Sequence, residues 1–482
     1  MNIVSSYTWC QFAPAFSLVG LAALLILADA LLPKLPKRSF AFIGAMGTFV
    51  AAYFLFSGEH ADIFGFIAAI ATGLSMLLAF DYKKICCDSI AGNGNEEGTG
   101  EFYALPLVAC AGILCLTQAR DLVMLFVSLE VVTLTSYVLA GYFRRNQGSI
   151  EAGIKYLVLG AMSTGVLVYG TAWYFGMSGT FCTSPAVVLE ALKGGVANSP
   201  TLAVGFLLAT ALLFAGAFFK IGAAPMHVWI PDVYQGAPTP TTSFLAVASK
   251  TAGFAVLCTL AMPFAPFAVP GSMVGKLFVW CFALVAAATL LIGNLGAMRQ
   301  SNIKRLLGYS SIGQAGFILI FFLNLTSPVV FMVSKYLLAY ALATIAAFYA
   351  VAMVRTQRGS EEIIAFRGLG KTNPRTAFLI TVCFASLAGV PLTLGFLVKM
   401  YSFVAVISTI SHWSCMMWVL PIMVISAAAG FYYYFKVIRA MYWDKPQAGD
   451  TPLQVPMCTA IVLTICALVL IYLGTMPLLL LA

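Results

Sequence analysis

The sequence predicts an all-α polytopic membrane protein with about 14 transmembrane helices, at roughly one helix and loop per 30–35 residues. Its composition is the first reason: 61% of the 482 residues are hydrophobic and only 9% are charged. Soluble proteins carry about 25% charged residues, so this chain could not cover a soluble surface. The second reason is that the apolar segments are long, whereas a membrane β-barrel shows alternating segments of about 10 residues. A soluble enzyme, a disordered chain and a disulfide-stapled chain are therefore excluded.

Each predicted span is a predominantly apolar stretch of the length that a bilayer requires. The spans cover residues 12–33, 39–58, 62–82, 101–118, 121–142, 151–177, 201–230, 241–263, 274–297, 303–323, 327–354, 375–408, 417–441 and 455–480. Two of them, 201–230 and 375–408, are long and contain both proline and glycine. Proline removes a backbone donor and clashes with the preceding turn, so we expect these two helices to be broken.

The distribution of basic residues supports this number of spans. With both termini outside, only Arg120, Lys193 and Lys276 fall on outer loops or span ends. The basic residues on the inner side are Lys34, Lys37, Arg38, Lys83, Lys84, Arg144, Arg145, Arg299, Lys304, Arg305, Arg355, Arg358, Arg367, Lys371, Arg375, Lys436, Arg439 and Lys445. This asymmetry is typical of inner-membrane proteins and predicts both termini on the outer side. It also accounts for the net charge of +9 without a nucleic-acid partner.

Short matches between the two halves suggest an internal duplication. Lys155-Tyr-Leu and Lys335-Tyr-Leu each lie early in a span, and Gly222–Pro225 and Ala388–Pro391 interrupt the two long spans. The members of each pair are five spans apart, so the copies would have opposite orientations, as in inverted repeats. The predicted organisation is three N-terminal helices in 1–100, a first repeat in 101–263, a second repeat in 274–445 and a C-terminal helix in 446–482.

Ionisable side chains inside spans are the candidate functional residues, because each costs several kcal/mol unless it is paired or hydrated. The single deep carboxylate is Glu130, and Lys155 and Lys220 are its candidate basic partners. Such a pair could be switchable and tune the proton affinity of a lysine, or it could be a fixed structural pair. A buried ion pair is weak evidence for a purely stabilising role, which favours the switchable reading.

Lysines near the breaks suggest a proton relay. Lys220 lies just before Gly222 and Pro225, and Lys399 follows Pro391 in the second broken span. Broken backbone at membrane depth survives only against protein or a water-filled cavity, so these amines are expected to reach water. Lys250 lies mid-span with no acid in its own span, and it is expected to lose its proton easily.

Other polar residues in the spans carry weaker signals. His227 follows Pro225 and has a side chain suited to proton transfer, although a lone histidine at a helix break is equally often structural. Lys335 lies near an outer span end and could extend its ammonium to the interface. The tyrosines at 234, 309 and 432–434 are expected to be packing or interface residues.

The sequence contains no pattern for a bound redox or nucleotide group. There is no G-x-G-x-x-G, Walker or C-x-x-C motif, and most of the 12 cysteines lie inside apolar segments, where free cysteine behaves as a small hydrophobe. We therefore expect no cofactor and no metal in this chain. The energy for transport would come from an ion gradient or from partner subunits.

One segment carries a specific family resemblance. Residues 218–240 read FFKIGAAPMHVWIPDVYQGAPTP, which resembles the antiporter-like membrane subunits of respiratory complex I, the proton-pumping NADH:quinone oxidoreductase. Residues 302–311 (NIKRLLGYSS) and 386–399 (SLAGVPLTLGFLVK) support the resemblance. The PDVYQGAP form and the length are most similar to the subunit N branch of that family.

The resemblance implies a fold of 14 helices with two inverted five-helix repeats, each containing a broken helix. It implies that Glu130 and Lys220 form the pair that couples neighbouring subunits, with Lys155 as a second basic partner. It also implies that Lys250 is the central relay residue and that Lys399 lies towards the outer exit. NADH, FMN, iron–sulfur clusters and quinone would then be bound by partner subunits, in a bacterial inner membrane.

Two other functions remain open from the sequence. The chain could be a subunit of a multi-subunit cation/proton antiporter, or the equivalent subunit of a related complex driven by ferredoxin. Sodium-dependent proton exchange without NADH would identify the antiporter, and the companions of the chain would identify the electron donor. A purely structural role is a third alternative.

Overall fold

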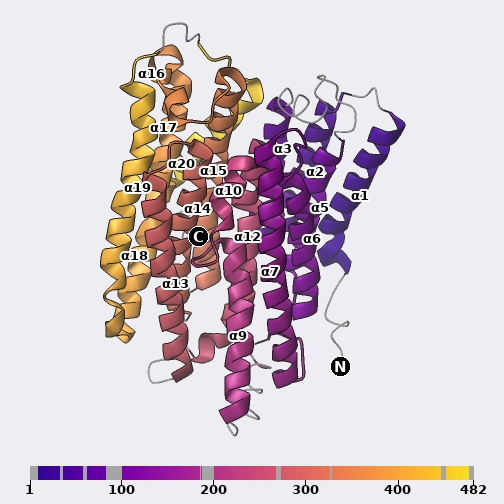
Figure 1. Ribbon diagram of the computed structural model, residues 1–482, viewed down its shortest axis with the longest axis vertical. Coiled ribbons are helices and arrows are strands. Elements are labelled where there is room, and N and C mark those ends of the chain that lie inside the picture. Colours follow the sequence, from indigo (N-terminus) through magenta and orange to yellow (C-terminus); the bar gives the residue numbers. More distant parts are fainter. Residues whose placement is uncertain are drawn as a thin grey trace.

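The computed structural model describes residues 9–32, 36–57, 62–82, 100–184, 186, 200–267, 273–325, 328–446 and 452–476. In these ranges the chain is a bundle of mostly long helices, with two isolated β-bridges, Asp121 to Cys182 and Asn302 to Glu362, outside them (Figure 1). The predicted all-α fold class is confirmed.

The helices follow one another along the bundle from the N-terminal to the C-terminal side (Figure 1). The first group is α1 (Trp9–Leu31), α2 (Arg38–Ser57), α3 (Ile63–Asp81), α5 (Gly100–Thr117), α6 (Leu122–Ala140) and α7 (Gln147–Ser178). The middle group is α9 (Pro200–Ile221), α10 (Trp229–Gly236), α11 (Thr239–Phe244), the π-helical turn η3 (Leu245–Ser249), α12 (Lys250–Ala261) and η4 (Met262–Phe267). The last group is α13 (Met273–Met298), α14 (Ile303–Leu319), η5 (Ile320–Leu323), α15 (Val329–Arg358), η6 (Ile363–Phe366), α16 (Leu369–Thr372), α17 (Pro374–Ala388), α18 (Leu394–His412), η7 (Ser414–Met416), α19 (Val419–Tyr442) and α20 (Met457–Thr475).

The number of spans agrees with the prediction. Thirteen helical stretches among the described residues are long and apolar enough to cross a membrane, and 205–221 and 374–388 are shorter apolar helices. The second shorter helix, α17, continues into α18 and forms with it one broken span. The first shorter helix, within α9, continues through a turn into α10. Both predicted broken helices are therefore present.

One end of the bundle carries most of the described basic residues, and we call it the basic end. Hydrogen bonds tie its loops together: Ile303 N–H donates to Glu361, Gly368 N–H to Ala440, and the Lys436 ammonium to the Gln300 carbonyl. The basic residues there include Arg299, Arg305, Arg355, Arg358, Arg367, Lys371 and Arg439. In Figure 1 this end lies at the top, where α16 is labelled.

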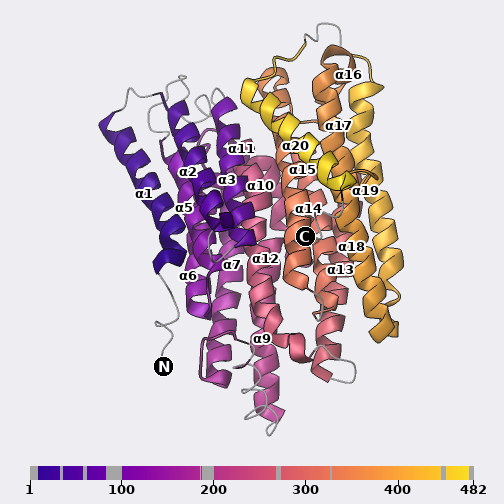
Figure 2. The ribbon, with the colours of Figure 1, turned by 180° about the vertical axis from the view of Figure 1, so that it is seen from behind.

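The last helix differs from a simple membrane crossing. α20 starts near the basic end, where Asp81 of α3 accepts hydrogen bonds from Thr459, and runs obliquely across α15, α17 and α18 (Figure 2). Near its end, a Cβ on Gly474 would lie 2.5 Å from the Thr393 carbonyl carbon, at the break between α17 and α18. α20 therefore reaches the level of the break by Gly474. Residues 1–8 and 477–482 lie outside the described residues, so the placement of both termini on the outer side stays a prediction.

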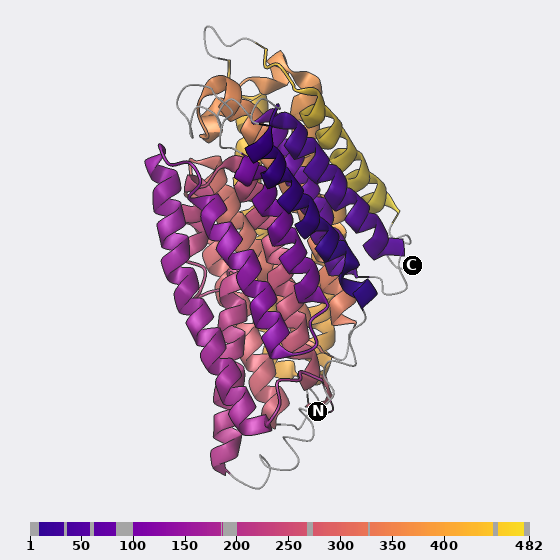
Figure 3. The ribbon, with the colours of Figure 1, turned by 90° about the vertical axis from the view of Figure 1, so that its right-hand side faces the viewer.

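Burial is concentrated in the middle of the bundle. The apolar windows of Thr239–Pro266 and Ile303–Leu323 are 94% buried, and that of α15 is 89% buried, against 22% for the N-terminal helix. In the side view the indigo and purple N-terminal helices lie in front of the pink and orange helices of the later segments (Figure 3). A polar side chain on α12, α14 or α15 is therefore shielded from lipid by protein. Ionisable residues of transmembrane helices usually face the bundle interior in this way.

Glycines permit the closest helix crossing in this central region. A Cβ on Gly293 of α13 would lie 2.3 Å from the backbone nitrogen of Gly313 on α14, a distance that real Cβ atoms do not adopt. Gly293→Val is therefore expected to destabilise the protein by about 1–3 kcal/mol or more, as overpacking of a rigid contact does. The measurement is the amount of folded chain in the membrane and its thermal stability in detergent. Gly165→Val on α7 is the control, since a Cβ there meets nothing within 4 Å; equal loss in both variants would contradict the expectation.

Candidate functional site: buried lysines at two helix breaks

The first break follows α9. Gly222 has φ of 72°, a left-handed conformation that suits glycine, and the Ala223 N–H donates to the Phe218 carbonyl over 2.9 Å. A bond to the carbonyl five residues earlier, after a left-handed glycine, is the pattern that ends many helices. Pro225 has no N–H to continue the helix, and α10 begins only at Trp229.

The second break repeats this geometry. Gly389 has φ of 87°, and the Val390 N–H donates to the Ala385 carbonyl, again five residues earlier, over 3.0 Å. Pro391 follows, as Pro225 does in the first break. The two breaks therefore share a left-handed glycine, the same hydrogen bond and a proline two or three residues later.

Lys220 lies in the last turn before the first break, and its side chain is buried. Its ammonium donates to the Thr133 hydroxyl of α6 over 2.6 Å, and the same hydroxyl donates to the Leu129 carbonyl. Glu130 of α6 accepts a hydrogen bond of 2.8 Å from Thr164 of α7. The direct Glu130–Lys220 ion pair expected from the sequence is not among the ion pairs of the described residues.

The reason is the position of Thr133. Residues three apart on a helix are neighbours on one face, so Thr133 lies one turn along α6 from Glu130. The Thr133 hydroxyl accepts the hydrogen bond of the Lys220 ammonium, and the Glu130 carboxylate lies one turn away on α6. The charge of Glu130 acts on Lys220 at a distance through protein rather than in contact.

Lys155 is not a partner of Glu130, which corrects the expectation from the resemblance. Its ammonium lies 2.7 Å from Asp232 of α10 and 2.6 Å from Glu151 of its own helix. Asp232 also accepts from the Arg305 guanidinium of α14 over 2.6 Å. These side chains are partly exposed, so the cluster ties α7, α10 and α14 together near the basic end instead of forming a buried pair.

Lys250 lies at the centre of the bundle. It is only 2% exposed, and it is the first residue after the π-helical turn η3. Its ammonium donates to the Ser311 carbonyl of α14 over 2.6 Å and lies 5.7 Å from the centre of the Tyr340 ring. No carboxylate forms an ion pair with it among the described residues. π-helical turns inside α-helices are frequent at functional sites, and no residue pattern in 245–249 predicted this one.

A glycine brings the first two lysines close in the fold. A Cβ on Gly253 of α12 would lie 3.2 Å from the Lys220 carbonyl carbon and 2.9 Å from the Ile221 side chain. Gly253 follows Lys250 by one helical turn. The end of α9 therefore packs directly on the turn of α12 that carries Lys250.

Lys399 lies on the second break. It is 7% exposed, and its ammonium donates to the carbonyls of Leu387 and Ala388 over 2.7 and 2.8 Å. These carbonyls end α17, where the helix dipole favours a cation by about 0.3–2 kcal/mol. The side chain passes over Gly389, since a Cβ there would lie 2.9 Å from the Lys399 Cδ. The helix end thus replaces the carboxylate that a buried ammonium would otherwise require.

His227 lies in the turn between the first break and α10. Its Nδ1 is buried and has no hydrogen-bond partner, and no hydrogen bond or ion pair joins it to a lysine among the described residues. The adjacent Met226 and Val228 are exposed and help to line a cavity of about 170 Å³ with Pro225 and Trp229. The structure therefore does not bring His227 together with Lys220, Lys250 or Lys399.

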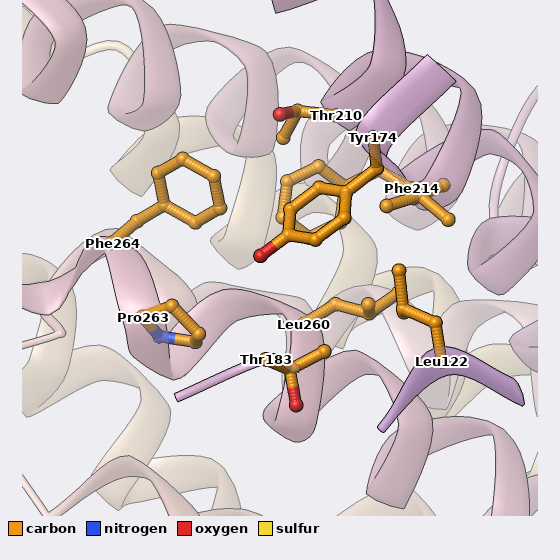
Figure 4. A pocket seen from close by; sticks show the side chains of 9 residues that line it. Leu122, Tyr174, Thr183, Thr210, Phe214, Leu260, Pro263 and Phe264 are labelled. Atoms are coloured by element: carbon orange, nitrogen blue, oxygen red, sulfur yellow. The ribbon is translucent and has the colours of Figure 1, made fainter. Parts of the chain in front are cut away.

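A small cavity lies far from the basic end. A cavity of about 20 Å³ at the end of the bundle opposite the basic end is lined mainly by apolar side chains such as Phe214, Leu260 and Phe264 (Figure 4). Its volume is near that of one water molecule. Within the part of the chain that the structure describes, no group of three or more His, Cys, Asp or Glu could hold a metal ion.

The outer surface beside Glu130 is apolar. Glu130 is half-buried; Val127 and Leu134, one turn from it on α6, are exposed, as are Ile154 and Val158 on α7. A groove of about 440 Å³ between these two helices ends at the charged side chains of Glu101 and Arg144.

The fold is that of a polytopic membrane protein. Its two broken helices and its buried lysines are features of membrane proteins that transport ions or protons. The chain belongs to the NADH:quinone oxidoreductase/Mrp antiporter membrane family, whose sequence model matches residues 119–427. The predicted family resemblance is therefore confirmed.

Individual relatives agree with the family. The chain is 33% identical to NADH-quinone oxidoreductase subunit N of Brevibacillus brevis, over 98% of this chain and 94% of the relative. It is 35% identical to subunit N of Moorella thermoacetica, over 93% and 91%.

Solved structures share the fold. A chain of respiratory complex I from Thermus thermophilus superimposes with a TM-score of 0.77 and 28% identity, over 97% of this chain and 99% of that chain. A chain of the Mrp complex from Dietzia has the same TM-score at 18% identity, over 98% and 96%, which shows the fold alone.

Proposed function

We propose that this chain is a proton-translocating membrane subunit of an NADH:quinone oxidoreductase, and that Lys220, Lys250 and Lys399 carry the protons. The observation that carries the proposal is the environment of these three ammonium groups. Each is buried, and each bonds to neutral oxygens instead of a carboxylate. An ammonium held this way can release its proton without leaving an uncompensated carboxylate behind.

The proposed sequence of events starts at Glu130. When Glu130 is ionised, its negative charge stabilises a proton on Lys220 from one helical turn away. When that charge is neutralised, the proton on Lys220 is destabilised by burial and moves towards Lys250, and from there towards Lys399. Because Gly253 packs tightly on the end of α9, Lys220 stays next to the turn of α12 that carries Lys250.

Lys155 and His227 have lesser parts in the proposal. The cluster of Lys155, Asp232 and Arg305 anchors α10, so that the segment after the first break keeps its place while Lys220 changes charge. His227 has a free acceptor or donor nitrogen beside the break, where a water molecule could deliver a proton. Their contribution is expected to be smaller than that of the three buried lysines.

The names of the relatives support the partner subunits that we propose for this chain. NADH oxidation and quinone reduction would take place in other subunits, which would hold the NADH, FMN, iron–sulfur clusters and quinone. The half-buried carboxylate of Glu130 fits contact with another membrane-arm subunit, because an ionisable side chain that faced lipid alone would be costly. A neighbour's charge placed there would act directly on Glu130.

We also propose the location and the organisation. The chain would lie in a bacterial inner membrane with the basic end on the cytoplasmic side, in accord with the positive-inside rule. Residues 101–263 and 274–445 would form the two repeats, after the three N-terminal helices of 1–100 and before the C-terminal helix of 446–482. The matching geometry at Gly222 and Gly389 supports this division.

The test is to tag the chain, extract it in mild detergent and analyse what co-purifies. The proposal predicts a large assembly with flavin and iron–sulfur clusters that oxidises NADH and reduces quinone. Companions without redox centres, together with sodium-dependent proton exchange in the absence of NADH, would overturn it. They would favour the second candidate, a cation/proton antiporter subunit. The fold that this chain shares with a chain of the Mrp complex supports that candidate. An assembly oxidising ferredoxin instead of NADH would retain the relay but change the electron donor.

A further inference from the structure

A glutamine lies at the meeting point of four helices in the second repeat. The side chain of Gln314, on α14, is buried among residues from α15, α17 and α19. Its Nε2 donates to the Leu387 carbonyl over 3.1 Å and to the Tyr434 hydroxyl over 3.3 Å. Its Oε1 accepts from the Tyr336 hydroxyl over 2.5 Å. Its Nε2 and its Oε1 are therefore both hydrogen-bonded inside the bundle.

The Leu387 carbonyl is available because of the helix break. In a continuous helix it would accept from the N–H four residues later, but that residue is Pro391, which has none. The carbonyl therefore accepts from two side chains, Gln314 and Lys399. Gln314 and the ammonium of Lys399 share one acceptor, so the position of one affects the hydrogen bonds of the other.

The other side of Gln314 leads towards Lys250. The Tyr434 hydroxyl, whose oxygen accepts from Gln314, also forms a short hydrogen bond with the Ser310 hydroxyl. Ser310 lies one turn before Gln314 on α14. The next residue, Ser311, provides the carbonyl that accepts from the Lys250 ammonium. One turn of α14 thus contacts Lys250 and, through Gln314, the acceptor of Lys399.

We infer that Gln314 is a positioning residue for proton transfer between Lys250 and Lys399, which it joins through Ser310, Tyr434 and the Leu387 carbonyl. This inference rests on the proposed function and deepens it. The amide itself does not titrate at neutral pH. It fixes the positions of the Tyr336 and Tyr434 hydroxyls and of the Leu387 carbonyl. The side-chain nitrogen of Lys399 therefore keeps one position while it receives its proton. The titratable groups around it are Lys399 from α18, Tyr336 from α15, and Tyr433 and Tyr434 from α19.

The test is made in the intact, tagged complex reconstituted in liposomes. Gln314→Leu preserves the approximate volume but removes every hydrogen bond, and proton translocation per NADH is expected to fall about five- to tenfold, the scale of one or two lost hydrogen bonds. Gln314→Glu, when ionised, accepts hydrogen bonds from the tyrosine hydroxyls but cannot donate to the Leu387 carbonyl, and it places a carboxylate beside Lys399. It is expected to restore most of the translocation and to move the alkaline limit of its pH profile to higher pH, because a nearby carboxylate stabilises the charged lysine.

Gln300→Leu is the control, since Gln300 follows α13 near the basic end and its amide donates to the Gly296 carbonyl of that helix. It is expected to translocate protons like the unmodified complex. Equal impairment of Gln314→Leu and Gln314→Glu would indicate a packing role and overturn the inference, as would normal translocation in Gln314→Leu. Failure of the proposed function is distinguishable, because Lys250→Met would then translocate as many protons per NADH as the unmodified complex.

Discussion

Replacing Lys220 with methionine is expected to abolish proton transfer through this chain while the complex still assembles. Methionine keeps the apolar stem in the space that the lysine fills, but it removes the proton-carrying group. Loss of a proton-transfer group typically costs about 10²–10⁴-fold in rate, so the ratio of protons translocated to NADH oxidised should fall clearly. The ratio is measured with a pH-sensitive dye in liposomes during NADH oxidation.

Two variants make the Lys220 result specific. Thr133→Val removes the hydroxyl that accepts from the ammonium without changing the shape, and a smaller loss is expected because Lys220 itself remains. Lys335→Met is the control: this lysine lies early in α15, with its ammonium 3.4 Å from the centre of the Phe331 ring. Normal translocation in Lys220→Met, or an equal loss in Lys335→Met, would contradict the role given to Lys220.

Replacing Lys399 is expected to have an effect of similar size, for a different reason. In Lys399→Met the Leu387 and Ala388 carbonyls lose their cation, and the last proton site of the relay disappears. Lys399→Arg keeps a positive charge on the helix end, but a guanidinium does not release its proton in proteins. Both variants are therefore expected to assemble and to lose proton translocation, with the loss measured as for Lys220.

The arginine variant separates a proton carrier from a structural cation. If Lys399 only neutralised the end of α17, Lys399→Arg would translocate protons normally, and that result would contradict the relay. Lys436→Met serves as the control, because its ammonium bonds the Gln300 carbonyl near the basic end. Normal rates are expected in that variant.

The helix breaks could be predicted from the sequence because their causes are local. Gly222 with Pro225, and Gly389 with Pro391, interrupt two apolar stretches whatever packs around them. The buried lysines could be found for a similar reason, since a charged residue inside an apolar stretch is visible without any knowledge of its partners.

The partners of these lysines could not be predicted, because they depend on tertiary contacts. The sequence favoured opposite charges, and so it paired Lys220 and Lys155 with Glu130. The structure gives Lys220 a threonine and Lys155 the aspartate after Pro231. Backbone carbonyls are invisible in sequence patterns, although they hold both Lys250 and Lys399.

The polar contacts of α14 were missed for the same reason. Gln314 and Tyr434 are 120 residues apart in the chain, and neither carries a charge that would attract attention in an apolar segment. The presence of glutamine in a span, four residues after Ser310, was the one available signal. The oblique path of α20 also depends on packing, here on the fit of Gly474 against the second break.

The most direct test of the central claim uses Lys250, which lies between the two breaks and at the centre of the bundle. The tagged complex with Lys250→Met is reconstituted in liposomes, and proton translocation is recorded together with electron transfer from NADH to ferricyanide, an acceptor that takes electrons before quinone. The account predicts assembly and normal electron transfer to ferricyanide, with proton translocation per NADH clearly reduced. An unchanged ratio of protons to NADH in the assembled variant would contradict a lysine relay through this chain.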